Sequence, residues 1–324
     1  IIAVKADNAN LRESLDHCLS LTERADEIIV LPDEPFDPPE GVLVVPTGPC
    51  GPAKKRDIGA AAAKGDIVAF LDDDAYPVHD WLAHAKGLFA DASIGGVGGP
   101  GVTPESDEFM AQVSGDIYAS PVVSGPHVRR YLPREASDVD DWPSCNLLVR
   151  REAFLAVGGF DSAYWPGEDT VLCLKLTQDL GLRLRYDPRV LVYHHRRPSL
   201  KRHFRQASQY GLHRGHFVKR FPETSRRPSY FAPSLLTAVL TIGWLPGVFV
   251  QRLRQVFWFL MAAYALTVVI ATPFRGSASR YTLAATGTVL THLTYGASFM
   301  RGLLQKDLPS PPSAGTTTAR ERTR

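Results

Sequence analysis

Short apolar runs alternate with helical patterns over the first hundred residues. The apolar runs predict strands at 1–5, 27–31, 42–45 and 66–72. Between them, 11–21 and 52–64 have the apolar spacing of helices. Alternation of this kind predicts an α/β fold with a mostly parallel, Rossmann-like sheet and helices on both faces. Ligands bind such sheets beyond the carboxyl ends of the strands, so the residues that end strands are the candidates for a site.

The pattern becomes less regular in the middle of the chain. The stretch 95–141 is rich in Gly, Pro, Ser and Asp, which predicts loops and short strands. After it we expect a strand at 144–150, a helix from 152 and a second helix at 170–180. A last strand at 189–193 and a basic amphipathic helix at 200–221 follow.

Three uncharged segments follow, at 231–250, 255–272 and 281–300. Each has about the ~20 residues that cross a bilayer, so we expect transmembrane helices between 231 and 303. Pro246 and Gly247 could break the first of them or make it re-entrant. The alternative is a helical soluble subdomain. The remainder, 304–324, has the low complexity of a disordered tail.

Charge is distributed unevenly along the chain. A net charge of +2 does not indicate nucleic-acid binding. Six cations without a carboxylate lie just before the apolar segments: Lys201, Arg202, Arg205, Arg214, Lys219 and Arg220. A basic run in this position indicates an anionic membrane surface. The four cysteines lack CxxC spacing, which is typical of reduced thiols in a reducing compartment.

An acidic turn carries the sharpest chemical signal. Asp72, Asp73 and Asp74 follow the apolar run 67–71 and therefore lie at the carboxyl end of a strand. Clustered negative charge is unfavourable unless a cation or hydrogen-bond donors compensate it. Such oxygen ligands suit Mg²⁺ or Mn²⁺, which would in turn hold a diphosphate. A solvated acidic turn is the alternative.

Two further clusters could complete a site with this turn. Lys54, Lys55 and Arg56 lie near the start of a helix, where cations are well placed for phosphate oxygens. Glu168 and Asp169 stand between a Pro-Gly turn and an apolar helix. Inverting sugar transfer needs a carboxylate to accept the proton of the attacking hydroxyl. Each cluster also has a plain interpretation, as a solvated face and as helix-capping acids respectively.

Six blocks in a fixed order resemble the family 2 glycosyltransferases of GT-A fold. They are IIAVKADNANLRESL, EIIVLPD, GPAKKRDIGAAAAKGDIVAFLDDDAYP, SCNLLVRREAFLAVGGFD, GEDTVLCLKL and RQASQYGLHRG. The chain is most similar to the membrane-attached branch of the family, which includes bacterial exopolysaccharide glucosyltransferases. The resemblance implies a catalytic domain over 1–215, with a nucleotide-sugar half at 1–100, an acceptor half at 101–199 and an interfacial helix at 200–221.

The resemblance implies a role for several residues on the donor side. Val4 and Lys5 would flank the nucleotide base, and Asp33 would contact it. Arg56 and Asp57 occupy the place of the family's Arg-Asn pair. These five residues, together with Lys54 and Asp73, are the candidates for binding the donor on this side of the site.

The resemblance also implies a metal centre and a catalytic base. Asp72 and Asp74 form the DxD motif, with Asp74 the direct ligand of Mg²⁺ or Mn²⁺. His194 would complete the coordination, unless it faces phosphate or the interfacial helix. Asp169 would be the catalytic base, with Glu168 orienting the acceptor or supporting the base. Asn146 and 158–161 would shape the acceptor side.

Two departures from the family pattern matter. The second strand ends in Leu-Pro-Asp33-Glu rather than Asp-Asp-Gly-Ser. Where processive relatives carry QxxRW, this chain has Gln206, Gln209 and Tyr210, which we also expect to contribute to the donor site. The loss of the Arg-Trp pair favours single additions over processive polymerisation.

The sequence therefore predicts an inverting, metal-dependent transferase. The sugar would move from a nucleotide-sugar to a hydroxyl of a lipid-linked or glycan acceptor at the cytoplasmic face of the inner (plasma) membrane. One alternative is a polyprenyl-phosphate sugar synthase of the same fold. It needs no proton-abstracting carboxylate, because its acceptor is already an anionic phosphate. A non-catalytic nucleotide-binding membrane scaffold is the other alternative.

Overall fold

A computed structural model gives the fold of residues 1–160 and 162–308. Two compact units share the chain, and each consists of two segments. Unit 1 comprises Ile1–Gly101 and Pro133–Tyr193, and unit 2 comprises Val102–Leu132 and His194–Leu308. Asp161 and most of the expected disordered tail lie outside the described residues.

Unit 1 contains an eight-stranded sheet with the order β3-β2-β1-β4-β9-β6-β10-β8. The strands are β1 (Ile2–Ala3), β2 (Ile28–Leu31), β3 (Val42–Val44), β4 (Ile67–Asp72), β6 (Ile94–Gly98), β8 (Ser137–Val139), β9 (Asn146–Arg150) and β10 (Arg183–Tyr186). The first four are parallel, as are β6 and β10, whereas β9 and β8 run antiparallel to their neighbours. The expected mostly parallel sheet is confirmed.

Helices cover both faces of this sheet, as the alternating pattern predicts. Along β4, Ala69 and Leu71 pack toward α1 (Ala9–Leu19) and α3 (Trp81–Leu88). The intervening Val68 and Phe70 pack toward the other face, because successive side chains of a strand point to opposite sides. The helices of that face are α2 (Pro52–Ala62), α6 (Arg151–Ala156) and α7 (Glu168–Gln178).

The register of the strands brings three chain segments together at one edge. Ala3 lies opposite Leu31 on one side and opposite Asp72 on the other. The residues that follow β1, β2 and β4 therefore meet at the carboxyl edge of the sheet. A second, three-stranded sheet has β11 (Val192–His194) between β5 (Ala75–Pro77) and β7 (Gly101–Val102). Since β5 begins directly after the acidic turn, β11 runs beside it.

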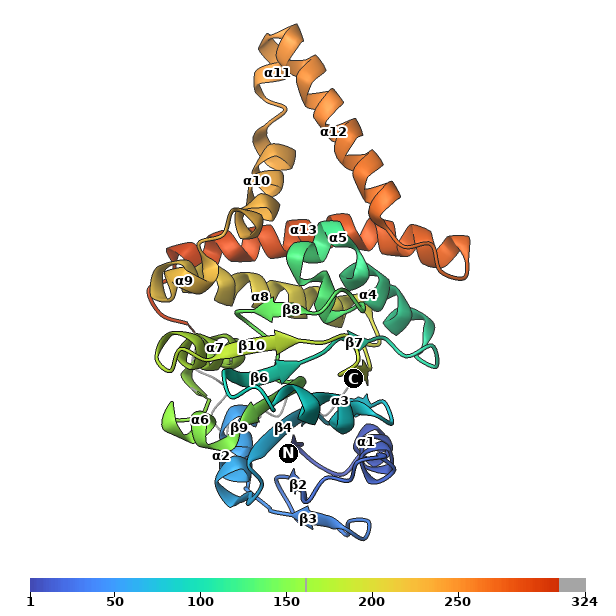
Figure 1. The fold of residues 1–324 in the computed structure, drawn as a ribbon. Helices are drawn as coiled ribbons and strands as arrows, with labels where there is room; N and C mark the ends of the chain where they lie inside the picture. The colour runs from blue at the N-terminus through green and yellow to red at the C-terminus, as the bar shows by residue number, and fades with distance from the viewer. Residues whose placement is uncertain (161, 309–324) are drawn as a thin grey trace. The chain divides into compact units, whose positions relative to one another are not determined.

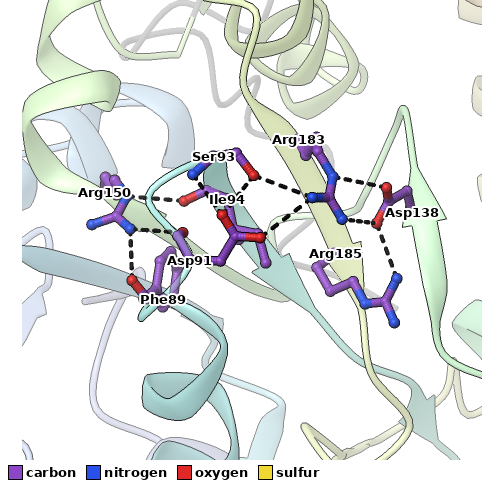
Figure 2. A network of polar contacts seen from close by, with 8 residues as sticks. All are labelled: Phe89, Asp91, Ser93, Ile94, Asp138, Arg150, Arg183 and Arg185. Atoms are coloured by element: carbon purple, nitrogen blue, oxygen red, sulfur yellow. Dashed lines mark hydrogen bonds and ion pairs between the residues drawn. The ribbon is translucent and has the colours of Figure 1, made fainter.

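An arginine network fastens the edge at which β6 and β10 begin (Figure 2). Arg150 donates to the carbonyl oxygens of Ile94 (2.9 Å) and Phe89 (2.7 Å). Arg183 reaches Asp138 of the edge strand β8 at 2.9 Å. Exposed pairs of this kind contribute at most about 1 kcal/mol each. We therefore regard the network as fixing the pairing of β8 rather than as a source of much stability.

Unit 2 is helical (Figure 1). Its longer helices are α4 (Phe109–Ala119), α8 (Leu200–Arg220), α10 (Pro228–Ile242), α12 (Gln251–Ala271) and α13 (Ala278–Leu304). Short helices α5 (Pro121–Ser124), α9 (Pro222–Ser225) and α11 (Pro246–Phe249) and the 3₁₀ turn η1 (Gly125–Arg130) connect them.

Helices α8 and α13 touch at their backbones. A Cβ atom on Gly211 would lie 2.5 Å from the carbonyl oxygen of Tyr295, and one on Gly215 would lie 2.1 Å from that of Phe299. Only glycine permits so close an approach. The buried Asp116 of α4 receives two hydrogen bonds from Arg280 of α13, one of them at 2.8 Å. Both contacts make α13 an integral part of unit 2.

The structure corrects the expectation of loops and short strands over 95–141, because α4 is a regular helix. Its Ser114 and Gly115 have the composition of a loop, but both have packing roles within unit 2. The Ser114 hydroxyl lies 2.7 Å from Nδ1 of the buried His203. A side chain at Gly115 would collide with Thr103, whose Oγ1 is 2.3 Å from the position of a Cβ atom.

The three apolar segments differ from one another in the structure. Among the described helices, only α12 is long and apolar enough to cross a membrane. The first apolar segment is divided between α10 and α11. The third lies in α13, which is less apolar and buries Thr288, Thr291 and His292 inside unit 2.

Candidate active site

Lys55 ties the ends of two strands together at the carboxyl edge of unit 1. The buried ammonium donates hydrogen bonds to the carbonyl oxygens of Val4 (2.8 Å) and Leu31 (3.1 Å) and to Oδ1 of Asp33 (2.6 Å). All three of its protons are therefore used within the protein. This differs from the phosphate-binding role expected of the Lys-Lys-Arg cluster, in which only Lys54 is exposed.

The candidate base-binding residues lie at the same edge. The carbonyl oxygen of Lys5 accepts the backbone N–H of Asp33 at 3.0 Å, and the Lys5 side chain is exposed. The Asp33 carboxylate is held by Lys55. The structure thus brings Val4, Lys5 and Asp33 together, as a shared role in contacting a nucleotide base would require.

Arg56 joins the acidic turn to the start of α7. Its buried guanidinium donates to Oδ1 of Asp72 at 2.5 Å and to Oε1 of Glu168 at 3.3 Å. These carboxylates come from segments about a hundred residues apart in the sequence, 72 and 168. A buried guanidinium between two carboxylates compensates their charge. The two acidic clusters predicted from the sequence therefore belong to one site.

The acidic turn has a donor set that fits a divalent cation. Carboxylate oxygens of Asp72 and Asp74 lie within 4.8 Å of one another, and both residues are partly exposed. Mg²⁺ and Mn²⁺ prefer oxygen ligands of this kind and keep open positions for phosphate oxygens. Asp73 instead accepts a hydrogen bond from Asn8 at 2.9 Å. Burial, followed by the charges of Asp74 and Asp72, raises the pKa of Asp73.

Glu168 and Asp169 occupy different environments at the start of α7. Glu168 is buried, and its Oε2 accepts the backbone N–H of Gly167 at 2.9 Å. Burial and then the charge of Asp169 raise the pKa of Glu168 to about 7, against the opposing effect of Arg56. Asp169 is half-buried and accepts the backbone N–H of Thr170 at 2.8 Å. Only Asp169 of this pair combines solvent access with the positive end of a helix dipole.

The raised pKa of Glu168 predicts that part of the stability is lost as the pH rises. The folded chain keeps this proton up to about pH 7, whereas an unfolded glutamate releases it near 4.5. The folded state therefore binds more protons between these values, and its free energy of unfolding falls with increasing pH. We expect Glu168→Gln to remove a slope worth about 1–3 kcal/mol across this window. The measurement is denaturant unfolding of the parent chain and of Glu168→Gln at several pH values, with a chelator present to remove metal. An equal pH dependence of the free energy of unfolding in the two chains would contradict the raised pKa of Glu168.

Two of the expected site residues have hydrogen bonds to other segments of unit 1. Oδ1 of Asp57 accepts the backbone N–H of Phe160 at 2.9 Å and so anchors the loop after α6. The Asn146 side chain is buried, accepts a hydrogen bond from the Trp81 indole at 3.0 Å and donates to the Val190 carbonyl at 2.7 Å. Both ends of its amide are thus used within unit 1, and its expected part in shaping the acceptor side stays a prediction.

The loop that Asp57 anchors contains the other acceptor-side candidates. Gly158 and Gly159 both have positive φ values, 81° and 71°. A Cβ atom on Gly159 would lie 2.4 Å from Oδ1 of Asp57. The glycines therefore give the loop its shape, and Asp161 lies outside the described residues.

The remaining candidates belong to unit 2 or to its boundary. Gln206 accepts a hydrogen bond from the buried Tyr118 (3.2 Å) and donates to Tyr210 (3.1 Å), which is 40% exposed. The backbone carbonyl of Gln209 accepts from His213. His194 is the last residue of β11, and the preceding Tyr193 stacks on Tyr76 of β5 with 5.2 Å between ring centroids.

Sequence reasoning missed two polar contacts of this site. Asn8 caps α1 by accepting the N–H of Leu11 at 2.9 Å while it donates to Asp73. An asparagine between a strand and a helix was the signal that could have identified it. The buried Asp141 accepts the Thr170 hydroxyl at 3.2 Å and thereby fixes the first turn of α7. The spacing of Asp141 and Thr170 in the sequence does not predict this contact.

Comparison with known proteins places these features in a wider context. The family described as Glycosyl transferase family group 2 matches residues 67–295. The chain is 33% identical over 197 residues to the pre-mycofactocin glycosyltransferase of Mycobacterium tuberculosis. The aligned region makes up 60% of this chain and 39% of that protein. It is 24% identical over 155 residues to the glucosyl-dolichyl phosphate glucuronosyltransferase of Haloferax volcanii. The aligned region makes up 44% of this chain and 47% of that protein.

The chain thus spans less than half the length of these curated relatives. Among solved structures, it resembles a mannosyltransferase from Pyrobaculum calidifontis in complex with GDP-Man and Mn²⁺. The TM-score is 0.54 at 19% sequence identity, over 94% of this chain and 86% of the other. This likeness is one of fold.

Proposed function

Because the chain belongs to Glycosyl transferase family group 2, we propose that this glycosyltransferase moves a sugar, with inversion, from a nucleotide-sugar to a hydroxyl of a lipid-linked or glycan acceptor. The observation that carries this proposal is that Arg56 forms ion pairs with both Asp72 and Glu168. These contacts join the acidic turn to the start of α7. A binding scaffold has no need to bury a guanidinium between two carboxylates, since burying charge is costly.

The donor half binds the nucleotide and a divalent cation. Val4, Lys5 and Asp33 contact the base, and Asp72 and Asp74 hold Mg²⁺ or Mn²⁺, with His194 as a further ligand. The Pyrobaculum mannosyltransferase, which shares the fold, was solved with a nucleotide-sugar and Mn²⁺, in support of this assignment. The cation supplies charge neutralisation for the leaving diphosphate.

The acceptor half supplies the base. Asp169 takes the proton of the acceptor hydroxyl as the hydroxyl oxygen forms its bond to the anomeric carbon and the bond to the diphosphate oxygen breaks. Glu168, which is buried and paired with Arg56, supports Asp169 in this role. Attack from the side opposite the leaving diphosphate gives inversion.

We further propose that the chain works at the inner membrane with unit 1 on the cytoplasmic side. The exposed apolar α12 and the basic α8 support a membrane location. The Haloferax relative, whose name includes a dolichyl phosphate, supports a lipid-linked acceptor.

Binding of nucleotide and metal tests the donor site. We would titrate UDP, GDP and dTDP into the detergent-solubilised chain with Mn²⁺ or Mg²⁺ present or removed. One nucleotide is expected to bind in a metal-dependent manner, and Asp74→Ala should weaken that binding at least about tenfold, since it removes a charged ligand. Asp26→Ala, which removes an exposed carboxylate outside the site, should bind normally. Absence of nucleotide binding under all conditions would refute the proposal and favour a scaffold.

A further inference from the structure

We propose that residues 228–271 form a two-pass membrane hairpin and that α13 remains on the same side of the bilayer as α8. The first pass is α10 with α11, and the second is α12. This inference rests on the proposed membrane location and specifies its topology. Figure 1 shows α11 at the apex of unit 2, where α10 and α12 meet.

Helix α12 matches the hydrocarbon core of a bilayer in length and composition. An 18-residue window of this helix has a mean hydropathy of 1.7, and at 1.5 Å per residue its 21 residues extend roughly 31 Å. Large apolar side chains are widely exposed, as for Phe259 (73%) and Ile270 (74%). An apolar surface of this size would be unfavourable in water, and acyl chains are the environment that suits it.

The first pass is interrupted between α10 and α11, yet five backbone amides at the break keep hydrogen bonds within the segment. After α10 ends, the amide groups of Gly243, Leu245, Gly247, Val248 and Val250 donate to carbonyl oxygens three or four residues back. In hydrocarbon each backbone polar group needs an internal partner, and these five amides have one. The break between α10 and α11 is therefore compatible with burial in lipid.

Polar side chains of the hairpin also find partners close by. The hydroxyls of Thr237 and Thr241 bond to carbonyl oxygens one turn earlier, and the Trp244 indole donates to the Thr241 carbonyl at 2.9 Å. In α12, Thr267 bonds to the Ala263 carbonyl at 2.8 Å. Such bonds reduce the cost of placing these groups in an apolar environment.

The charges lie at both ends of α12 and nowhere between them. Arg252 and Arg254 are at the apex, and the next charged residue is Arg275, beyond the end of the helix. Placing a cation at the middle of a bilayer costs roughly 2.5–3.5 kcal/mol on insertion scales. The two groups of arginines therefore belong at opposite headgroup layers, which places the apex across the bilayer.

Helix α13 cannot follow as a third pass, because it is packed along a highly charged helix. Two hydrogen-bonded pairs join α8 to α13, His203 with Thr291 and Ser208 with Ser298. A third joins Lys219 to the carbonyl of Gln305, the residue that follows α13. Since α8 carries six cations between Lys201 and Arg220 and no carboxylate, it is excluded from hydrocarbon. A helix held beside it stays at the same surface.

Cysteine accessibility in intact bacterial cells tests this topology. Gln251→Cys places a thiol at the apex, whereas Ser279→Cys and Asp307→Cys place one at each end of α13, all at exposed positions. With a membrane-impermeant maleimide polymer, Gln251→Cys should gain the mass of one reagent molecule relative to the parent chain. Ser279→Cys and Asp307→Cys should gain it only after the cells are permeabilised.

The other outcomes have distinct meanings. Labelling of Ser279→Cys and Asp307→Cys from opposite sides would show that α13 crosses and would overturn the hairpin. Labelling of all three variants from one side would show that α12 does not cross and would also overturn it. If the apex alone proves cytoplasmic, the hairpin stands but the proposed cytoplasmic side of unit 1 fails. Metal-dependent nucleotide binding, measured separately, is unaffected by any of these results.

Discussion

Asp169→Asn is expected to reduce sugar transfer by about 10²- to 10⁴-fold, the usual contribution of a general base. The side chain is half-buried at the start of α7, whereas the neighbouring Glu168 is buried against Arg56. Asparagine keeps the size of the side chain and its ability to accept the Thr170 N–H, but it cannot take a proton from a hydroxyl. The turnover number should therefore fall while metal-dependent binding of the nucleotide persists.

Two matched variants make this result specific. Asp179→Asn changes an exposed aspartate at the other end of the same helix and should leave transfer unchanged. Glu168→Gln should retain more activity than Asp169→Asn. The opposite ranking would exchange the roles of the two carboxylates, and near-normal turnover of Asp169→Asn would exclude it as the base. Transfer to a phosphate acceptor that resists Asp169→Asn would instead favour a polyprenyl-phosphate sugar synthase.

At pH 8, where Glu168 is ionised, Arg56→Met is expected to lower the free energy of unfolding by about 3–5 kcal/mol, because it leaves the buried carboxylate of Glu168 and the partly exposed one of Asp72 without their countercharge. Arg56 is 5% exposed, and its guanidinium contacts both Asp72 and Glu168. Methionine fills a similar volume without the charge. The measurement is denaturant unfolding of the purified chain, monitored by tryptophan fluorescence.

Lys54→Met is the matched control, since Lys54 lies on the same helix but is exposed. It should change the free energy of unfolding by no more than about 0.5 kcal/mol. In a Glu168→Gln background, Arg56→Met should cost less, because one of the two carboxylates is already neutral. An equal cost in both backgrounds would show that the ion pair with Glu168 contributes little.

Apolar periodicity predicted the strands and helices that border the site. The runs at 27–31 and 66–72 correspond to β2 and β4. Both lie in the interior of the sheet, so most of their side chains had to be apolar. Because the carboxyl ends of parallel strands share an edge, β2 and β4 bring Asp33, whose role the family resemblance implied, to the same edge as the acidic turn. Family membership, predicted from the six blocks, is confirmed.

The sequence could not distinguish the members of its Lys-Lys-Arg cluster. Consecutive residues on a helix point about 100° apart, so Lys54 faces solvent while Lys55 and Arg56 face the sheet. Their composition gives no sign of this difference. Similarly, Asn146 resembled a ligand-binding residue, whereas its amide joins Trp81 to Val190, partners that are far away in sequence. Such contacts depend on tertiary structure alone.

Helix α4 illustrates a further limit of pattern reading. Polar and small residues predicted a loop, because Ser114, Gly115 and Asp116 interrupt its apolar face. In unit 2 these residues are all buried and each has a packing partner on another segment. A helix whose polar side chains are satisfied only by distant neighbours has no local signature.

The ion pair between Asp116 and Arg280 has a consequence for how the protein is made. The two residues are separated by 164 positions in the chain. At a synthesis rate of about 5–20 residues per second, the aspartate emerges roughly 8–30 seconds before its arginine. During that interval α4 cannot be buried in its final environment, whereas the first hundred residues already contain a parallel β-sheet. Ribosomes that stall before α13 would therefore release chains with an exposed α4, which quality-control proteases and chaperones are equipped to recognise.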